Sequence, residues 1–233
     1  MIGTIINVVA IIVGSLVGLL FGSKIPEKLK ATVVSGMGLF TMAMGMQMFL
    51  KSENQLIVLG ALILGALLGE LLGIEDGLQA LGQKLEARFS RDTETGSGSR
   101  FVRGFMVSSL LFCIGPMAIL GSIQDGLTGD YNMLAVKSTL DGFASVAFAS
   151  TLGIGVMFSS LILLIYQGGI SLLAAQLSAI VTTPMMNEMT ATGGVLLIGL
   201  GVSNLLEIKK IRVGNFLPAI LFAPLIVWIL SLF

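Results

Sequence analysis

The sequence predicts an all-α protein, a polytopic transmembrane bundle of about eight helices. Hydrophobic residues make up 55% of its 233 residues and charged residues only 11%, whereas about one quarter of an average soluble domain is charged. The mean hydropathy is +0.99. The chain contains several apolar runs, each about 20 residues long, which is the length of helix that crosses a bilayer. The lipid bilayer is therefore the expected solvent and the first partner of the chain.

Three apolar runs occupy the N-terminal part of the chain and predict spans at residues 4–22, 31–50 and 55–73. No Lys or Arg precedes the first run and no small-residue cleavage site ends it, so we expect a retained span. The first and third runs also carry glycines at four-residue spacing, namely Gly14, Gly18, Gly22, Gly65 and Gly69. This spacing predicts close contact with neighbouring helices, within the chain or between copies in a homo-oligomer.

Residues 74–103 form the only long polar stretch. One helical face of it is apolar, which predicts an amphipathic helix on the cytoplasmic membrane surface or against the bundle; its members are Leu78, Leu81, Leu85 and Phe89. The sequence RDTETGSGSR at residues 91–100 has the composition of a flexible linker.

Five further apolar runs follow, at residues 104–123, 140–166, 168–183, 191–206 and 214–232. The run at 168–183 is short, and it is interpreted either as a short span or as a re-entrant hairpin. With eight spans, eleven Lys and Arg residues fall on one side of the membrane and two on the other. If 168–183 does not cross, the distribution is eight against five. Because basic loops stay in the cytoplasm, eight spans with both termini outside are favoured.

Gly115-Pro116 breaks the run at 104–123, and Pro184 ends the short run at 168–183. Proline removes a helix hydrogen bond, and a break in a lipid environment is tolerated where protein or a water-filled cavity covers it. Polar residues flank these two weakest spans, namely Gln124, Asp125, Asn187 and Glu188. Their carboxylate and amide oxygens suit a hard cation, a proton or the ammonium of a small ligand. We therefore expect Asp125 and Glu188 to be ligands near an outer entrance.

Asp141, Asn204 and Gln47 are expected to line the path from this entrance. For Asp141, which precedes Gly142 at the expected start of a span, the alternative is a helix-start carboxylate stabilised by the helix dipole. None of the ionisable residues falls at the centre of an expected span.

The sequence lacks the residues that several classes of protein function require. The chain contains no histidine and one cysteine, Cys113, which excludes a structural zinc site and histidine-based catalysis. No glycine-rich loop is followed by the Lys and Ser/Thr that cradle phosphates. The formal net charge is zero, which gives no reason to expect a nucleic-acid partner. We expect a protein that is not an enzyme and that carries no cofactor.

A faint internal repeat is present. Residues 38–45 (GLFTMAMG) and 194–201 (GVLLIGLG) share their glycine spacing, and one further span follows each. On the eight-span count they belong to spans two and seven, which run in opposite directions. An inverted-topology repeat of this kind is common in secondary transporters.

Residues 113–142 (beginning CIGPMAILGSIQDG and ending KSTLDG) and 187–206 (NEMTATGGVLLIGLGVSNLL) resemble the YqgA/YdfK-like family of bacterial inner-membrane proteins, known as domain of unknown function 554. The opening IGTIINVVAIIVGSLVG and the stretch ALLGELLGIEDGL fit the same pattern. The resemblance implies a multi-pass protein of the bacterial inner membrane. Residues 141–144 and 193–199 are also similar to segments of small manganese-exporter-like transporters built from inverted repeats, which carry Asp-Ala where this chain has Asp141-Gly142.

Together these observations favour a secondary transporter or channel for a cation or a small metabolite. The alternative is a membrane scaffold or sensor that transports nothing and docks a partner through residues 74–103.

Overall fold

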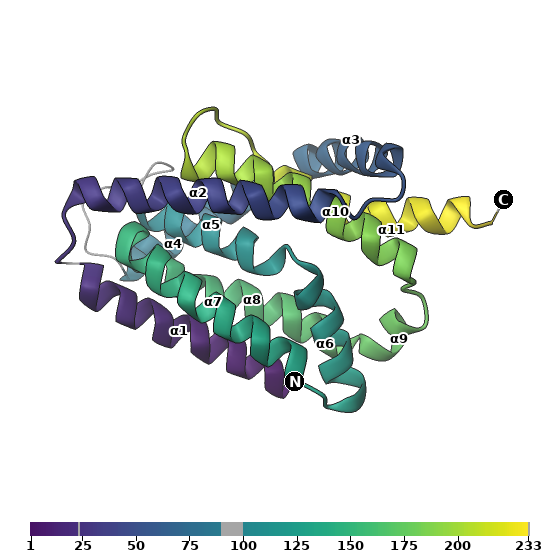
Figure 1. The fold of residues 1–233 in the computed structure, drawn as a ribbon, viewed down its shortest axis with the longest axis horizontal. Coiled ribbons are helices and arrows are strands. Elements are labelled where there is room, and N and C mark those ends of the chain that lie inside the picture. Colours follow the sequence, from purple (N-terminus) through teal and green to yellow (C-terminus); the bar gives the residue numbers. More distant parts are fainter. Residues whose placement is uncertain (23, 90–99, 233) are drawn as a thin grey trace. The chain divides into compact units, whose positions relative to one another are not determined.

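The computed structural model describes residues 1–22, 24–89 and 100–232, which form helices and no strands (Figure 1). In chain order the helices are α1 (Ile2–Gly22), α2 (Glu27–Phe49), α3 (Gln55–Leu72), α4 (Ile74–Phe89), α5 (Arg100–Cys113), α6 (Pro116–Thr128), α7 (Asn132–Leu152), α8 (Gly155–Leu172), α9 (Ala174–Ser178), α10 (Thr183–Leu200), the π-turn η1 (Gly201–Leu205), the 3-10 turn η2 (Val213–Phe216) and α11 (Ala219–Leu230). The expected all-α class is confirmed.

By length and composition, six of the described helices are long and apolar enough to cross a membrane: α1, α2, α3, α8, α10 continued by η1, and η2 continued by α11. Helices α5 and α6 pass the same test only as a pair, bent by 63° at the break between them. Counted as one span, this pair makes a seventh. The break lies at the expected Gly115-Pro116, because Pro116 opens α6 and cannot continue α5.

The helix boundaries differ from the sequence expectation between residues 132 and 200. The expected span 140–166 is divided between α7 and α8, because Gly153 takes a φ of +86°, which ends α7. The expected segment 168–183 is also divided, since its first residues end α8 and α9 is only five residues long. Pro184 lies in the first turn of α10 rather than at a break, and proline is well tolerated at that position.

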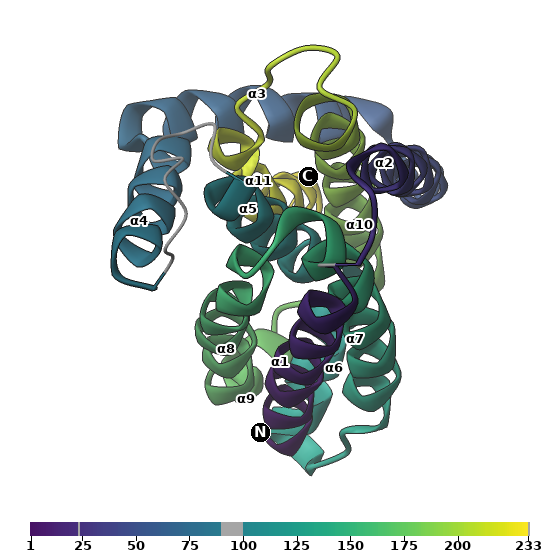
Figure 2. The same ribbon diagram turned by 90° about the vertical axis from the view of Figure 1, so that its left-hand side faces the viewer.

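The chain forms two compact units. Unit 1 contains Met1–Ser35, Gln79–Cys113 and Met117–Ala179, and therefore α1, α5, most of α6, α7 and α8. Within it α1 packs on α7 and α8, and α5 packs on α8 (Figure 2). Its core is apolar and aromatic: Phe101, Phe105 and Phe112 are buried on α5, and Phe101 contacts Phe158 of α8 with ring centroids 5.5 Å apart.

Glycines bring α1 and α7 into backbone contact. A Cβ on Gly14 would collide with the carbonyl oxygen of Gly142, and one on Gly22 would lie 2.7 Å from that of Ser150. Gly18 meets Val146 in the same way. The residue numbers rise together, so α1 and α7 run parallel, and the close contact predicted from the glycine spacing is confirmed.

Unit 2 contains Gly36–Leu78, Ile114–Pro116 and Ile180–Phe233. Here α3 packs on α11, with Gly65 against Ala219 and Gly69 against Asn215. Residue numbers rise along α3 while those of its contacts on α11 and η2 fall, so α3 and α11 are antiparallel. The end of α2 crosses α10 in the same antiparallel sense, with Gly45 against Gly194 and Gly38 against Leu206.

Helix α4 lies where the amphipathic helix was expected, but its apolar face is only partly covered: Leu78 and Leu85 are half-buried, and the Phe89 ring contacts that of Phe158 with centroids 5.1 Å apart. Leu81 and Phe89 are exposed, at 40% and 54%, whereas Glu75, Gly82 and Glu86 are buried. Most of the expected linker at 91–100 lies outside the described residues.

Candidate functional site

An ion pair lies in the interior of α7. The Lys137 ammonium contacts Oδ2 of the Asp141 carboxylate one helical turn away. Both residues are buried, at 6% and 9% exposure. Lys137 is the sixth and Asp141 the tenth of the helix's 21 residues. The alternative that Asp141 is a helix-start carboxylate is therefore wrong.

Amide side chains from two other helices complete this cluster. Asn7 of α1 donates from Nδ2 to Asp141 Oδ2 at 2.9 Å, and the same nitrogen reaches Oε1 of Gln167 on α8 at 3.4 Å. Asn7 and Gln167 are both 0% exposed. Their other amide atoms, Asn7 Oδ1 and Gln167 Nε2, have no hydrogen-bond partner. We call Asn7, Lys137, Asp141 and Gln167 the polar cluster.

Unpaired hydroxyls extend the polar cluster along the contact between α1 and α7. Thr4, Ser15 and Ser145 are fully buried, and their hydroxyl oxygens have no partner. Ser145 stands beside Gly14, whose added Cβ would lie 3.2 Å from the serine Cβ. We call these three residues together with the polar cluster the polar seam. Buried polar groups are normally satisfied, and an unsatisfied one costs about 1–3 kcal/mol.

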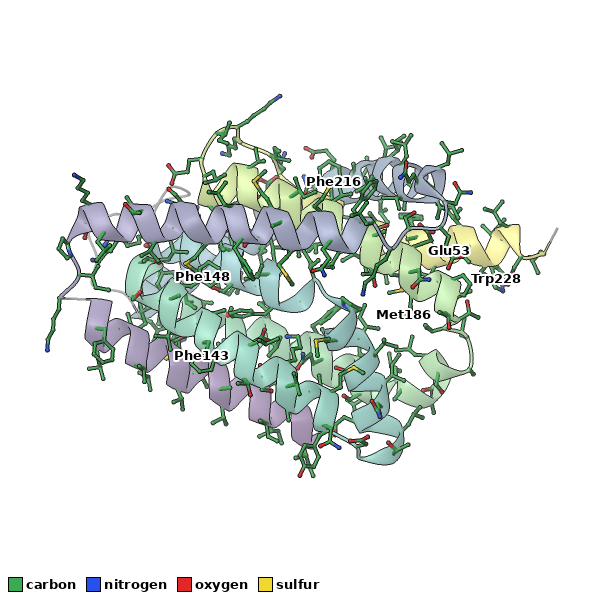
Figure 3. All side chains as sticks on the ribbon, viewed as in Figure 1. Glu53, Phe143, Phe148, Met186, Phe216 and Trp228 are labelled. Carbon is green, nitrogen blue, oxygen red and sulfur yellow. The ribbon has the colours of Figure 1, made fainter. Side chains whose placement is uncertain are left out.

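Packing of α1, α7 and α8 encloses the polar seam. The other side of α7 is exposed at Phe143, at 74%, whereas Phe148 is buried at 2% (Figure 3). Glycines on α1 leave only small side chains between the two backbones, so the few polar groups there are enclosed by α1, α7 and α8. In a bilayer, ionisable groups held in this way mark ion or substrate sites.

Asp125, predicted as a ligand, instead caps α1. Its Oδ2 accepts from the backbone N–H of Gly3 at 3.1 Å, and its Oδ1 lies 3.1 Å from the amino group of Met1. Gln124 donates to Asp130 Oδ2 at 2.8 Å. A carboxylate at a helix N-terminus satisfies free N–H groups and complements the helix dipole.

Glu188, predicted as the second ligand, caps α3 in the same way. It accepts from the backbone N–H groups of Glu53 and Asn54 at 2.8 and 3.0 Å, and from the Ser52 hydroxyl at 2.8 Å. Asn187 donates to Glu53 Oε1 at 2.7 Å, in the turn labelled in Figure 3. Asp125 belongs to unit 1 and Glu188 to unit 2, and each has its partners within its own unit.

The remaining predicted residues are placed in unit 2. Gln47 is an exposed residue on α2, and Asn204 lies in the π-turn η1 that ends α10. π-turns inside helices are frequent at functional sites. The carbonyl and N–H of Ile211 bond the Ser203 side chain at 3.0 and 2.9 Å, which anchors the connector that follows the turn.

A second group of charges surrounds Arg212 in unit 2. Its guanidinium contacts Glu70 at 2.6 Å and also binds Asp76, while Asn215 donates to Glu70 at 2.5 Å. Glu75 of α4 accepts from Gly214 N–H at 2.6 Å. Burial raises the pKa of Glu75, which the Gly214 N–H and Arg212 oppose. These contacts attach α4 to η2. Each of these charged side chains is already paired within the group.

Sequence reasoning included Asp141 among the path residues but left Asn7, Lys137 and Gln167 out of the site. One local signal was available: opposite charges at Lys137 and Asp141, four residues apart, are adjacent on a helix. Gln167 and Asn7 carried no such signal, because their partner is more than twenty residues away. Among the described residues, no three Cys, Asp or Glu side chains are grouped to hold a metal ion.

Comparisons with known proteins identify relatives over nearly the whole chain. The chain is 33% identical over 237 residues to an uncharacterised membrane protein, YdfK, of Bacillus subtilis (strain 168), covering 100% of this chain and 98% of that one. It is 33% identical over 222 residues to the uncharacterised protein YqgA of Escherichia coli (strain K12), covering 95% and 94%. No solved structure matches it. The family described as "Protein of unknown function (DUF554)" matches residues 2–228, and the chain therefore belongs to this family.

Proposed function

We propose that this membrane protein is a secondary transporter or channel for a cation or a small polar metabolite, and not an enzyme. The observation that carries the proposal is the Lys137–Asp141 ion pair inside α7, with Asn7 and Gln167 around it. Placing two charges within a bilayer is costly, and such groups are retained mainly on ion and substrate pathways. In this role Asp141 is the anionic ligand, and Lys137 occupies it until a cation or the substrate displaces the ammonium.

The proposal includes α7 as an eighth span. The charged residues of α7 exclude it when membrane spans are counted by hydropathy alone. However, Lys137 and Asp141 neutralise each other, and α7 packs along the glycines of α1. In the order α1, α2, α3, α5–α6, α7, α8, α10, α11, the first and fifth spans are parallel, and the second and seventh are antiparallel. Both agree with the observed helix directions. Without α7, α10 would run in the same direction as α2, which is contrary to the contact between Gly45 and Gly194.

The charges support the same topology, with both termini outside the cytoplasm of the bacterial inner membrane. With α7 and α8 as spans five and six, the eleven basic residues in the connectors and at the adjoining helix ends stay on one side. Lys51 alone is on the other side, since Lys137 now lies within a span. The antiparallel contact between segments 38–45 and 194–201 favours the inverted repeat as the origin of unit 2.

A ligand screen by thermal unfolding of the detergent-purified protein tests the proposal. The panel contains monovalent and divalent cations, amino acids and carboxylates, each also measured as flux into vesicles containing the protein. A ligand at about 100 times its dissociation constant adds roughly 2.7 kcal/mol to the stability of the native state. We expect a ligand whose shift and flux disappear in Asp141→Asn and persist in the control Asp130→Asn, which changes a half-buried carboxylate in the loop before α7. Binding and flux that are unchanged in Asp141→Asn would contradict the proposal.

The alternative, a scaffold or sensor, is favoured by one observation. Leu81 and Phe89 on α4 are exposed, so this helix has an apolar face to offer to lipid or to another protein. A scaffold predicts that no solute moves and that a cysteine at position 141, in a Cys113→Ala background, never reacts with a water-soluble thiol reagent. A transporter predicts reaction, because its site must open to water.

A further inference from the structure

We infer that the ion carried by the polar seam is the proton, and that Asp141 and Lys137 are the groups that exchange it. This inference rests on the proposed function and names the coupling or transported ion of the same site. It is independent of which solute moves. It follows from three features of the seam. Several buried polar atoms are unpaired, the one carboxylate is already bound by the Lys137 ammonium, and glycines bring the backbones of α1 and α7 into contact.

Unpaired polar atoms lie on α1, α7 and α8 around the ion pair. They are Thr4 Oγ1, Asn7 Oδ1, Gln167 Nε2, Ser145 Oγ and Ser15 Oγ. From Thr4 to Ser15, α1 rises about 16 Å, roughly half of a hydrocarbon core. Each of these buried atoms needs a partner, and ordered water is the usual one where protein supplies none. Hydroxyls and bound water in series are the components of a proton relay.

The seam suits a proton better than a metal ion. It offers one carboxylate, that of Asp141, and the Lys137 ammonium already occupies it. A metal cation would have to displace this ammonium and then remain beside a positive charge. The backbone contacts of Gly14 with Gly142 and of Gly18 with Val146 also close the space between α1 and α7. A hydrated ion does not fit there, whereas a proton passes from one oxygen to the next.

Few other charges face the pair. Helix α1 carries no Asp, Glu, Lys or Arg. Cys113 of α5 interacts electrostatically with Lys137 and Asp141, and Tyr166 of α8 interacts with Cys113. Asp125 of α6 is the acidic side chain that contacts α1, and it already binds the Gly3 N–H and the Met1 amino group. Proton exchange is thus confined to the Lys137–Asp141 pair, with the seam as its connection.

The exchange conserves charge at each step. A proton that enters the seam binds the Asp141 carboxylate, which becomes a carboxylic acid and releases the Lys137 ammonium. The ammonium then gives up one proton to the far part of the seam and becomes a neutral amine. Transfer of the proton from Asp141 Oδ2 to Lys137 Nζ restores the original ion pair. One proton has entered and one has left.

The test is proton entry into vesicles of phosphatidylethanolamine and phosphatidylglycerol that contain the full-length protein. A pH-sensitive dye reports the interior, and a potassium gradient with valinomycin sets the membrane potential. Entry is recorded without solute and with each solute that moves in the ligand screen. We expect protein-dependent acidification that falls roughly 100-fold or more in Asp141→Asn, as is typical when a single proton-transferring group is lost. Asp130→Asn should match the unchanged protein.

Two further variants keep the test decisive if Asp141→Asn does not fold. The double variant Lys137→Met, Asp141→Asn removes both charges and leaves no unpaired ion, so it should fold and should also lack proton entry. Ser145→Ala should slow entry, whereas Ser150→Ala, on the same helix and bonded to Ala147, should not. Solute movement without any proton movement that depends on Asp141 would overturn the inference and leave the proposed function standing. If neither solute nor proton moves, both fail.

Discussion

Gly45 of α2 and Gly194 of α10 are each placed against the other's backbone. A Cβ on Gly45 would lie 2.5 Å from the carbonyl oxygen of Gly194, and a Cβ on Gly194 would collide with the carbonyl oxygen of Gly45. Two turns away, a Cβ on Gly201 would lie 3.0 Å from the carbonyl oxygen of Gly38. The two segments with matching glycine spacing are thus each other's packing partners, and the contact looks the same from either side.

This contact predicts that neither glycine of the pair tolerates a side chain. Gly45→Val or Gly194→Val should lower the free energy of unfolding by about 1–3 kcal/mol, because the backbones must separate. The matched control is Gly36→Val, since a Cβ at Gly36 meets nothing within 4 Å. Thermal unfolding in detergent provides the measurement. Equal losses at positions 36 and 45 would mean that helix propensity, and not the contact, sets the effect.

The ion pair in α7 predicts strong coupling between its two members. Asp141→Asn or Lys137→Met alone leaves one buried charge without its partner and should cost about 3–5 kcal/mol. The double variant should cost clearly less than the sum. A double-mutant cycle on unfolding free energies measures this coupling. Additive losses would show that the two side chains are solvated separately.

The contacts of Glu188 predict a structural effect at the start of α3. Glu188→Leu leaves the N–H groups of Glu53 and Asn54 without an acceptor and should cost about 1–3 kcal/mol. Glu188→Gln keeps an acceptor and loses only the charge, so its cost should be smaller, about 0.3–1 kcal/mol. If Glu188→Gln instead abolishes ligand binding with unchanged stability, Glu188 is a ligand after all, as the sequence suggested.

Glu75 predicts a specific dependence of stability on pH. Burial raises its pKa above the ordinary value of 4.5. The stability that its protonated form contributes is fully present below that ordinary value, and it is lost as pH rises through the raised pKa. Glu75→Gln stays neutral and still accepts from Gly214. The melting temperature of the variant relative to the unchanged protein should therefore increase with pH across this window and then level off. A difference that decreases with pH would have the wrong sign.

The fold was predictable from sequence where the signal was local. Glycine spacing predicted the close face of α1, and Pro116 marked the bend between α5 and α6. The start of α7 was not predictable by hydropathy, because the charge of Lys137 lowers the average although Asp141 neutralises it one turn later. The break at Gly153 was also missed, since glycine is common in this chain and only the backbone angle distinguishes this one.

The candidate site was less accessible to sequence reasoning for a different reason. Asp125 and Glu188 are notable in sequence because they flank the two weakest expected spans, and in the structure each caps a helix N-terminus. Asn7 reaches Asp141 from 134 positions away and Gln167 from 160, separations that no residue pattern encodes. Burial on three helices at once, and not residue type, distinguishes the polar cluster.

The parallel contact of α1 with α7 has a consequence for biosynthesis. Asn7 and Thr4 enter the membrane with the first helix, more than a hundred residues before Asp141 is made. During that time the polar side chains and the glycine-lined face of α1 lack α7, the helix against which they pack in the native structure. A chain that stalls before α7 would expose both to lipid, so completion of unit 1 depends on late-inserting helices. Ribosome-bound chains truncated before residue 132 should accordingly be degraded or held by insertion factors, and chains extended beyond α8 should be released.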